Sequence, residues 1–276
     1  MSCSILILTL NEASNLPECL ASVAWADDIV VFDSCSTDRT MEIARSAGAR
    51  AIQRPFDNYA SQRNAALGEV PYRHPWVLML DADERVTPEL REEIQRALAG
   101  IDESVGLFRV RRKDMFMGRW LRRSSGYPTW FGRLIRVGSV RVEREVNEEY
   151  RTEDRILYLQ EHLIHYPFTK GIAFWFDRHN RYSTVESVMR EAEGGREISW
   201  RGLLSRDPVV RRMNLKAFAY RLPGRPVLVF FYLYLIRLGI LDGLAGLRFC
   251  VLRAIYEIMI DLKSVEIRRR SKGLPV

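Results

Sequence analysis

Short apolar segments alternate with segments of helical periodicity over the first 111 residues, and this alternation limits the chain to a few fold classes. The apolar segments are predicted to be strands, and they cover residues 4–10, 29–33, 49–53, 76–80 and 105–111. Helices are predicted for residues 16–23, 37–47 and 60–67, and another is predicted to begin at Thr87-Pro88-Glu89. Strands and helices that alternate in this way form right-handed βαβ crossovers around a mostly parallel sheet. The predicted fold class is therefore α/β.

The strand predicted at residues 76–80 runs directly into three acidic residues, Asp81, Asp83 and Glu84. A continuous apolar run is typical of a strand covered on both faces, and ligands of parallel sheets bind beyond the carboxyl ends of the strands. Asp81 and Asp83 are two residues apart, so an extended chain directs both to the same side. Two close carboxylates favour a cation between them, and Mg²⁺ or Mn²⁺ combines carboxylate with phosphate ligands. These acids predict a metal–diphosphate site, although a solvated turn has the same pattern.

Further candidate ligand-binding residues follow the first two predicted strands. They are Thr9, Leu10, Asn11 and Glu12 after the first strand, and Asp33, Ser36 and Asp38 after the second. In a parallel sheet these turns are neighbours, and they offer amide, hydroxyl and carboxylate groups to a base and a ribose. The alternative is that the Ser-Thr-Asp run only caps the next helix.

Gln62, Arg63 and Asn64 begin a short helix just before the acidic strand. Arg63 suits a diphosphate and Asn64 a hydroxyl, whereas the alternative is a solvated helix face. The chain has neither G-x-G-x-x-G nor G-x-x-x-x-G-K-[ST], which argues against a dinucleotide oxidoreductase and a P-loop NTPase.

The charge of the chain indicates the class of its partner, and its cysteine content indicates the cellular compartment. The chain of 276 residues has a formal net charge of +7, and the excess of Arg and Lys is concentrated after about residue 108. This asymmetry predicts an anionic partner: nucleic acid, a phosphorylated sugar or a membrane surface. The four cysteines lie far apart and form no metal-binding pair, and no signal peptide is recognised, so a cytosolic protein is expected.

Aromatic and basic residues mix between residues 109 and 131, which suits a phosphorylated sugar because aromatic faces stack on sugar rings and guanidinium groups bind phosphate. The candidate acceptor-binding residues are Arg122, Arg123, Tyr127 and Trp130. The same mixture also suits single-stranded nucleic acid. That interpretation leaves the acidic strand end without a function, so nucleic acid is not expected as the partner.

The chain becomes helical beyond about residue 168. Residues 227–236 are apolar or aromatic, and residues 240–260 continue the apolar character but are interrupted by charges. These stretches are too short and too charged for a simple bilayer span. They indicate either an interfacial helical hairpin on an anionic leaflet or a buried subunit interface, so a homo-oligomer also stays open.

Several motifs, in this order and spacing, resemble the family 2 inverting glycosyltransferases of the GT-A fold, and within them the lipopolysaccharide core β-1,4-glucosyltransferase group. The motifs are Thr9-Leu10-Asn11-Glu12, Asp33-Ser34-Cys35-Ser36-Thr37-Asp38, Gln62-Arg63-Asn64, Asp81-Ala82-Asp83-Glu84, Gly126-Tyr127-Pro128, Arg133-Leu134-Ile135-Arg136, His165-Tyr166, Asn180-Arg181-Tyr182-Ser183 and Gly239-Ile240-Leu241-Asp242-Gly243. Two positions depart from the pattern. Cys35 stands where the family usually has Gly, and Asn147 stands where the group commonly has His.

The resemblance implies a GT-A catalytic domain at residues 1–167 and a helical, membrane-associating extension at residues 168–276. It implies a UDP-sugar donor, contacted also by Asp81 and Ala82, and Mg²⁺ or Mn²⁺ held by Asp81 and Asp83 with His165. An inverting transfer needs one general base. Glu148 is the first candidate, and Glu145 and Asp114 stay open.

The implied reaction moves a hexose, with glucose preferred, to a lipid-linked saccharide such as the lipopolysaccharide inner core. The implied location is peripheral, on the cytoplasmic side of the inner membrane. A different cell-envelope glycan or a polyprenyl-phosphate-linked acceptor is the alternative. Two other classes are a sugar-nucleotide pyrophosphorylase, which lacks support because residues 9–15 form no Gly-rich basic loop, and a non-catalytic membrane or nucleic-acid binding module.

Overall fold

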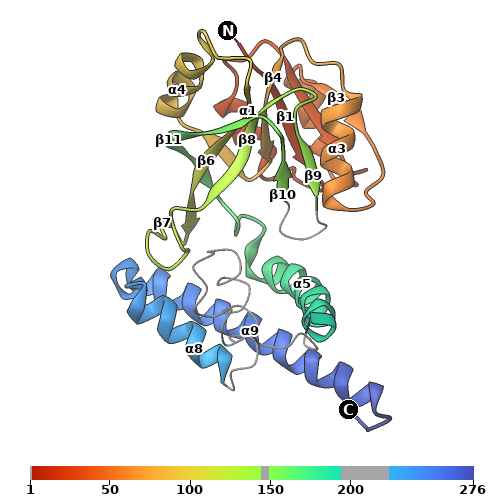
Figure 1. Cartoon of the computed structure of the whole chain (residues 1–276), viewed down its shortest axis with the longest axis vertical. Helices are drawn as coiled ribbons and strands as arrows, with labels where there is room; N and C mark the ends of the chain where they lie inside the picture. Colours follow the sequence, from red (N-terminus) through yellow and green to blue (C-terminus); the bar gives the residue numbers. More distant parts are fainter. Residues whose placement is uncertain (1, 144–148, 194–223) are drawn as a thin grey trace. The chain divides into compact units, whose positions relative to one another are not determined.

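The computed structural model describes residues 2–143, 149–193 and 224–276, which divide into two compact units (Figure 1). Unit 1 consists of Met1–Met115 and Tyr127–Thr169, and unit 2 consists of Phe116–Gly126 and Lys170–Val276. Unit 2 therefore includes the segment Phe116–Gly126, which the sequence-based division assigned to the N-terminal domain.

Unit 1 is built on a mixed sheet with the strand order β3-β2-β1-β4-β8-β6-β11-β5. In that order the strands are Arg50–Gln53, Ile29–Asp33, Ser4–Thr9, Trp76–Asp81, Trp130–Arg136, Val105–Phe116, Arg155–His165 and Glu84–Val86. The first four are parallel neighbours, and β6 and β11 are also parallel. Strand β8 runs antiparallel to β4 and β6, and β5 runs antiparallel to β11. Strands β9 (Arg141–Glu143) and β10 (Glu149–Arg151) pair separately.

The predicted α/β fold is confirmed, and the first strands and helices lie where the alternating pattern placed them. The helices of unit 1 are α1 (Leu16–Ser22), α2 (Thr40–Ser46), α3 (Tyr59–Glu69) and α4 (Pro88–Leu98). Thr87 caps α4 as predicted, since its side chain accepts a hydrogen bond from the Leu90 amide. Helix α2 begins at Thr40 rather than at residue 37, because Ser36 and Asp38 bind the loop after β1.

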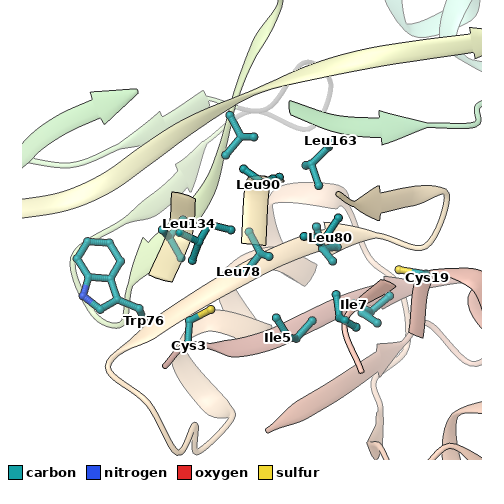
Figure 2. Close-up of a cluster of buried hydrophobic side chains, with 14 of the residues drawn as sticks. Cys3, Ile5, Ile7, Cys19, Trp76, Leu78, Leu80, Leu90, Leu134 and Leu163 are labelled. Atoms are coloured by element: carbon teal, nitrogen blue, oxygen red, sulfur yellow. The ribbon is translucent and has the colours of Figure 1, made fainter. Parts of the chain in front are cut away.

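Strands β1 and β4 are buried on both faces, as the continuous apolar runs predicted. Ile5 and Leu78 belong to one apolar cluster, which also contains Leu90 of α4 (Figure 2). Leu6 and Met79, one position along each strand, belong to a second cluster with residues of α3. All four of these β1 and β4 side chains are fully buried. This core fixes the carboxyl ends of β1 and β4 side by side, where the polar residues follow.

Unit 2 is helical apart from the short strand β7 (Arg119–Trp120). Its elements are α5 (Gly171–Glu193), α8 (Arg225–Phe231), the π-helical turn η1 (Tyr232–Ile236), the 3-10 turn η2 (Gly239–Asp242) and α9 (Gly243–Ser271). Helix α9 packs against both α5 and α8. Among the described helices, none alone has the length and apolarity to cross a bilayer. The stretches Arg225–Ile236 and Gly239–Ser271 meet that test only together, with a 73° bend between them.

Candidate active site

Asp81, the last residue of β4, lies between two arginines that other elements of unit 1 supply. One carboxylate oxygen is 2.9 Å from Arg63 Nη2 on α3, and the other is 2.6 Å from Arg133 Nη2 on β8. Burial raises the pKa of Asp81, but the charges of Arg133 and Arg63 outweigh it and hold this pKa well below its usual range. Asp81 is therefore a charge-compensated carboxylate whose position is fixed by both guanidinium groups.

Asp83 and Asp114 flank His165, the last residue of β11. His165 Nε2 lies 3.2 Å from Asp83 Oδ2, and His165 Nδ1 lies 2.7 Å from Asp114 Oδ1. Burial and the charge of Arg112 lower the pKa of His165, but the two carboxylates raise it overall to about 9. The pairing of β5 with β11 creates this arrangement, because it brings His165 opposite Glu84 in register.

Glu84 joins these two groups into one network. Its side chain is fully buried, and its Oε1 atom lies 2.8 Å from Arg133 Nη2 and 3.5 Å from Arg112 Nη1. Arg112 in turn contacts Asp114, with 3.1 Å between its Nε atom and Oδ1. The sequence analysis quoted Arg133 only as part of a motif and counted Arg112 among the basic residues of the 109–131 stretch that suits a phosphorylated sugar. The available signal was Arg133 in the interior of a strand that is apolar or Gly up to its last residue, Arg136.

The pair formed by Asp83 and His165 fits a divalent cation. Two ligand atoms ~2.1 Å from one octahedral ion, and at right angles to each other, are about 3.0 Å apart. The observed separation of 3.2 Å is close to this value. A bound cation would displace the Nε2 proton of His165, and Asp114 at Nδ1 would then leave Nε2 available as a ligand, the usual carboxylate–histidine arrangement at metal sites. The described residues contain no group of three or more His, Cys, Asp or Glu side chains that could hold a metal ion.

The loops after β1 and β2 bind each other through the residues predicted to contact a nucleotide. Asp33 is fully buried and accepts a hydrogen bond from the Thr9 hydroxyl at 2.8 Å. Asn11 donates its amide to Ser36 Oγ at 2.7 Å and accepts from the Thr37 amide at 2.8 Å. Further bonds from this predicted set are Glu12 N to Thr40 Oγ1 and Ala13 N to Asp38 Oδ2. Leu10 is exposed.

Of the predicted motif on α3, only Arg63 reaches the acidic strand end. Gln62 is buried and donates to Ser34 Oγ at 3.1 Å, so it lies beside the loop after β2. The Asn64 side chain exchanges two hydrogen bonds with the Val142 backbone, both 2.8 Å long, and thereby anchors β9. Ala82 is buried between the two aspartates.

The predicted acceptor residues divide between the two units. In unit 1, Arg111 lies over the rings of Tyr127 and Trp130, at 5.9 Å and 5.5 Å from their centroids. Arg122 and Arg123 belong to unit 2 and are exposed.

The candidate bases Glu148 and Glu145 lie outside the described residues. The third candidate, Asp114, is bound to His165 and Arg112 in the network above. An engaged carboxylate is poorly placed to take a proton from an acceptor, which favours a role for Asp114 in positioning His165 and leaves its role as base an untested prediction.

Comparison with known proteins identifies the class that this fold and site define. The model of "Glycosyl transferase family 2" matches residues 4–174, which is more than half of the chain. The chain therefore belongs to glycosyl transferase family 2, and its fold is the GT-A fold.

Two relatives show the extent of the similarity. The chain is 38% identical over 120 residues to "Lipopolysaccharide core biosynthesis glycosyltransferase LpsC" of Rhizobium meliloti, covering 42% of this chain and 43% of that protein. It is 39% identical over 97 residues to an "Uncharacterized glycosyltransferase" of Rickettsia bellii, covering 35% of this chain and 32% of that protein. The matched region thus spans less than half the length of these curated relatives.

Solved structures are similar at lower identity. Glucosyl-3-phosphoglycerate synthase from Mycobacterium tuberculosis, in complex with Mn²⁺, uridine diphosphate and glucosyl-3-phosphoglycerate, is 21% identical, with coverage of 46% of this chain and 47% of that chain and a TM-score of 0.34. Staphylococcus aureus TarS 1–349 is 14% identical, with coverage of 98% and 92% and a TM-score of 0.46.

Proposed function

We propose that this protein is a metal-dependent inverting hexosyltransferase that uses a UDP-sugar, with glucose as the preferred hexose. The proposed acceptor is a lipid-linked saccharide such as the lipopolysaccharide inner core. The observation that carries the proposal is the pairing of Asp83 with His165 beside the arginine-held Asp81, at the ligand-binding edge of the sheet. Family membership and the similarity to LpsC support the reaction class and the acceptor.

Different residues of unit 1 bind different parts of the donor in this proposal. The hydrogen-bonded loops after β1 and β2 form the base and ribose side of the pocket, with Asp33 and Asn11 holding the loops in shape. Asp83 and His165 would hold Mg²⁺ or Mn²⁺, which supplies positive charge to the diphosphate leaving group. Arg63 and Arg133 fix the carboxylate of Asp81 next to that position. Glu84, buried beneath them, keeps Arg133 in place.

The transfer itself is a single in-line displacement. The acceptor oxygen forms a bond to the anomeric carbon of the hexose while the bond from that carbon to the diphosphate breaks. The acceptor hydroxyl gives its proton to a general base, for which Glu148 is proposed. UDP leaves with the electron pair of the broken bond, and one displacement inverts the anomeric configuration.

A donor screen that measures released UDP tests this function, followed by incubation with extracted lipid-linked acceptors. Asp83→Asn keeps the size of the side chain and removes its charge. We expect it to lose at least 100-fold in transfer and to weaken Mn²⁺-dependent UDP binding. Glu92→Gln is the matched control, because Glu92 is an exposed acid of α4 in the same unit. Normal transfer by Asp83→Asn would remove the proposed mechanism.

A further inference from the structure

Six large apolar side chains are exposed together at the bend between α8 and α9. They are Leu235, Ile236, Leu238, Ile240, Leu241 and Leu244, each between 44% and 73% exposed, and we call them the apolar tip. They fall within ten consecutive positions of the chain, so they lie close to one another. Single exposed apolar residues need no explanation, whereas a contiguous group marks an interaction surface. Elsewhere on α9 the exposed apolar residues are more widely spaced.

The fold holds the apolar tip in a fixed shape. Asp242 is buried, and its Oδ2 atom accepts hydrogen bonds from the Arg123 amide, the Ser124 amide and the Ser124 hydroxyl, at 2.8–2.9 Å. Gly246 of α9 approaches Gly239 so closely that a Cβ atom on Gly246 would lie 2.3 Å from the Gly239 carbonyl oxygen. The exposed leucines therefore sit on a pre-formed turn, a low-entropy arrangement for binding.

Arginines surround the apolar tip. Arg119 donates to the Leu241 carbonyl at 3.1 Å, and Arg248 lies on α9 one turn beyond Leu244. Arg119, Arg122, Arg123 and Arg248 are all exposed. Between residues 235 and 248 the only acidic residue is Asp242, which is buried. Unit 2 as a whole has 23 Arg and Lys against 10 Asp and Glu, whereas unit 1 has 19 against 25.

We propose that the apolar tip inserts into the interface of an anionic lipid leaflet, with these arginines contacting the phosphate groups. Exposed leucines next to cationic side chains match the apolar and anionic layers of such a surface. A second copy of the chain fits less well. A two-fold contact through the tip would bring the same arginines face to face, and like charges oppose association. This inference does not depend on the proposed transferase reaction, because it concerns a different unit and a different ligand.

Co-sedimentation with vesicles tests the proposal on the full chain. We expect binding to vesicles of equal parts phosphatidylglycerol and phosphatidylcholine, and little binding to phosphatidylcholine alone. Leu241→Gln with Leu244→Gln should weaken binding to the anionic vesicles at least tenfold, since both leucines lose their apolar burial. The matched control is Val185→Gln with Val188→Gln, two exposed apolar residues of α5, which should bind like the unchanged protein.

The arginines are tested separately. Arg248→Gln should weaken binding to anionic vesicles about fivefold, the effect of removing one cation near the surface. The same change at Lys272, the exposed lysine beyond α9, should have a smaller effect. UDP binding with Mn²⁺ should be unchanged in every one of these variants, which separates this proposal from the reaction.

Three results would overturn the proposal. The unchanged protein could fail to sediment with anionic vesicles, or the double leucine variant could bind as tightly as the unchanged protein. The third is a stable dimer that forms without lipid and that the double leucine variant abolishes, which would make the tip a subunit interface.

Discussion

At the scale of single residues, Asp114 shows how a buried carboxylate acts through its neighbour. It accepts from His165 Nδ1 at 2.7 Å and is held by Arg112. Asp114→Asn keeps the shape but removes the charge that orients the imidazole, so we expect Mn²⁺ affinity in the presence of UDP to fall about tenfold. Titration of free Mn²⁺ by electron paramagnetic resonance measures this directly. UDP binding without metal should not change.

Asp102→Asn is the control for that experiment, since Asp102 is an exposed acid of unit 1. Equal Mn²⁺ affinity in Asp114→Asn and in the unchanged protein would show that Asp114 has only a structural role. Loss of transfer with full Mn²⁺ affinity would instead reopen Asp114 as the general base.

Cys35 stands where the family usually has Gly, and the backbone at this position shows why glycine suits it. Its φ of +62° lies in the left-handed region, and its side chain is exposed. Relative to glycine, a residue with a Cβ atom pays roughly 1–2 kcal/mol in that region. Glycine loses more conformational freedom on folding, which offsets part of this difference. We therefore expect Cys35→Gly to raise the free energy of unfolding by about 0.5–1 kcal/mol in urea denaturation. Cys35→Ala keeps the Cβ atom and should give no gain. An equal gain from Ala would contradict the backbone explanation.

At the scale of elements, the sequence allowed the parallel half of the sheet to be predicted and left the other half open. Strands β1, β2, β3 and β4 carry local apolar runs and are separated by helices with caps or Gly stops, so their existence, their parallel direction and the pairing of β1 with β2 were predictable. The pairing of β4 with β1 rather than with β3 does not follow from the order of the strands along the chain. Strands β8, β11 and β5 pair through contacts between residues far apart in sequence. No local pattern encodes such pairings.

The same distinction explains the candidate site. Asp81 and Asp83 were recognisable because they end an apolar strand. Their partners Arg133 and His165 lie 52 and 82 residues further along the chain, on strands whose neighbours were not predictable. Long-range charge pairing, which a single sequence does not reveal, therefore supplies half of the network.

Helix α5 carries a histidine that should make the stability of unit 2 depend on pH. His179 stacks on Trp175 at 3.7 Å between ring centroids, and it contacts Tyr256 of α9 edge-on. Burial, assisted by the charges of Arg178 and Arg253, lowers the pKa of His179 to about 4. The unfolded chain keeps a pKa near 6.5, so between these values it binds more protons than the folded chain does. The contribution of His179 is complete above about pH 6.5 and is lost as the pH falls towards 4.

We expect His179→Gln to reduce this dependence, because glutamine does not titrate. The measurement is the urea midpoint by circular dichroism at pH 7, 5.5 and 4.5. Comparing the variant with the unchanged protein at each pH cancels the carboxylates that titrate in the same range. A variant that loses as much stability on acidification as the unchanged protein would contradict the assignment.

At the scale of the whole molecule, the chain leaves unit 1 at Phe116 and returns at Tyr127 before it enters unit 2 again at Lys170. Unit 2 is therefore assembled from two segments, and the short one is held by the long one. Phe116 and Leu121 are buried, Phe116 packs against Phe249 with 6.4 Å between centroids, and Asp242 binds the backbone at residues 123 and 124. Neither segment has its native partners without the other.

This connectivity predicts the outcome of removing the helical region. A chain ending at residue 169 leaves Phe116 and Leu121 without the residues that cover them, so we expect it to aggregate on expression. The same chain with residues 116–126 replaced by a Gly-Ser linker should be soluble and bind UDP with Mn²⁺ as the full chain does, because the network of Asp81, Asp83 and His165 lies wholly in unit 1. Soluble expression and calorimetric UDP titration of both chains provide the measurement. If the linker chain also aggregates, unit 1 depends on unit 2 for its own stability, and the two units fold as one.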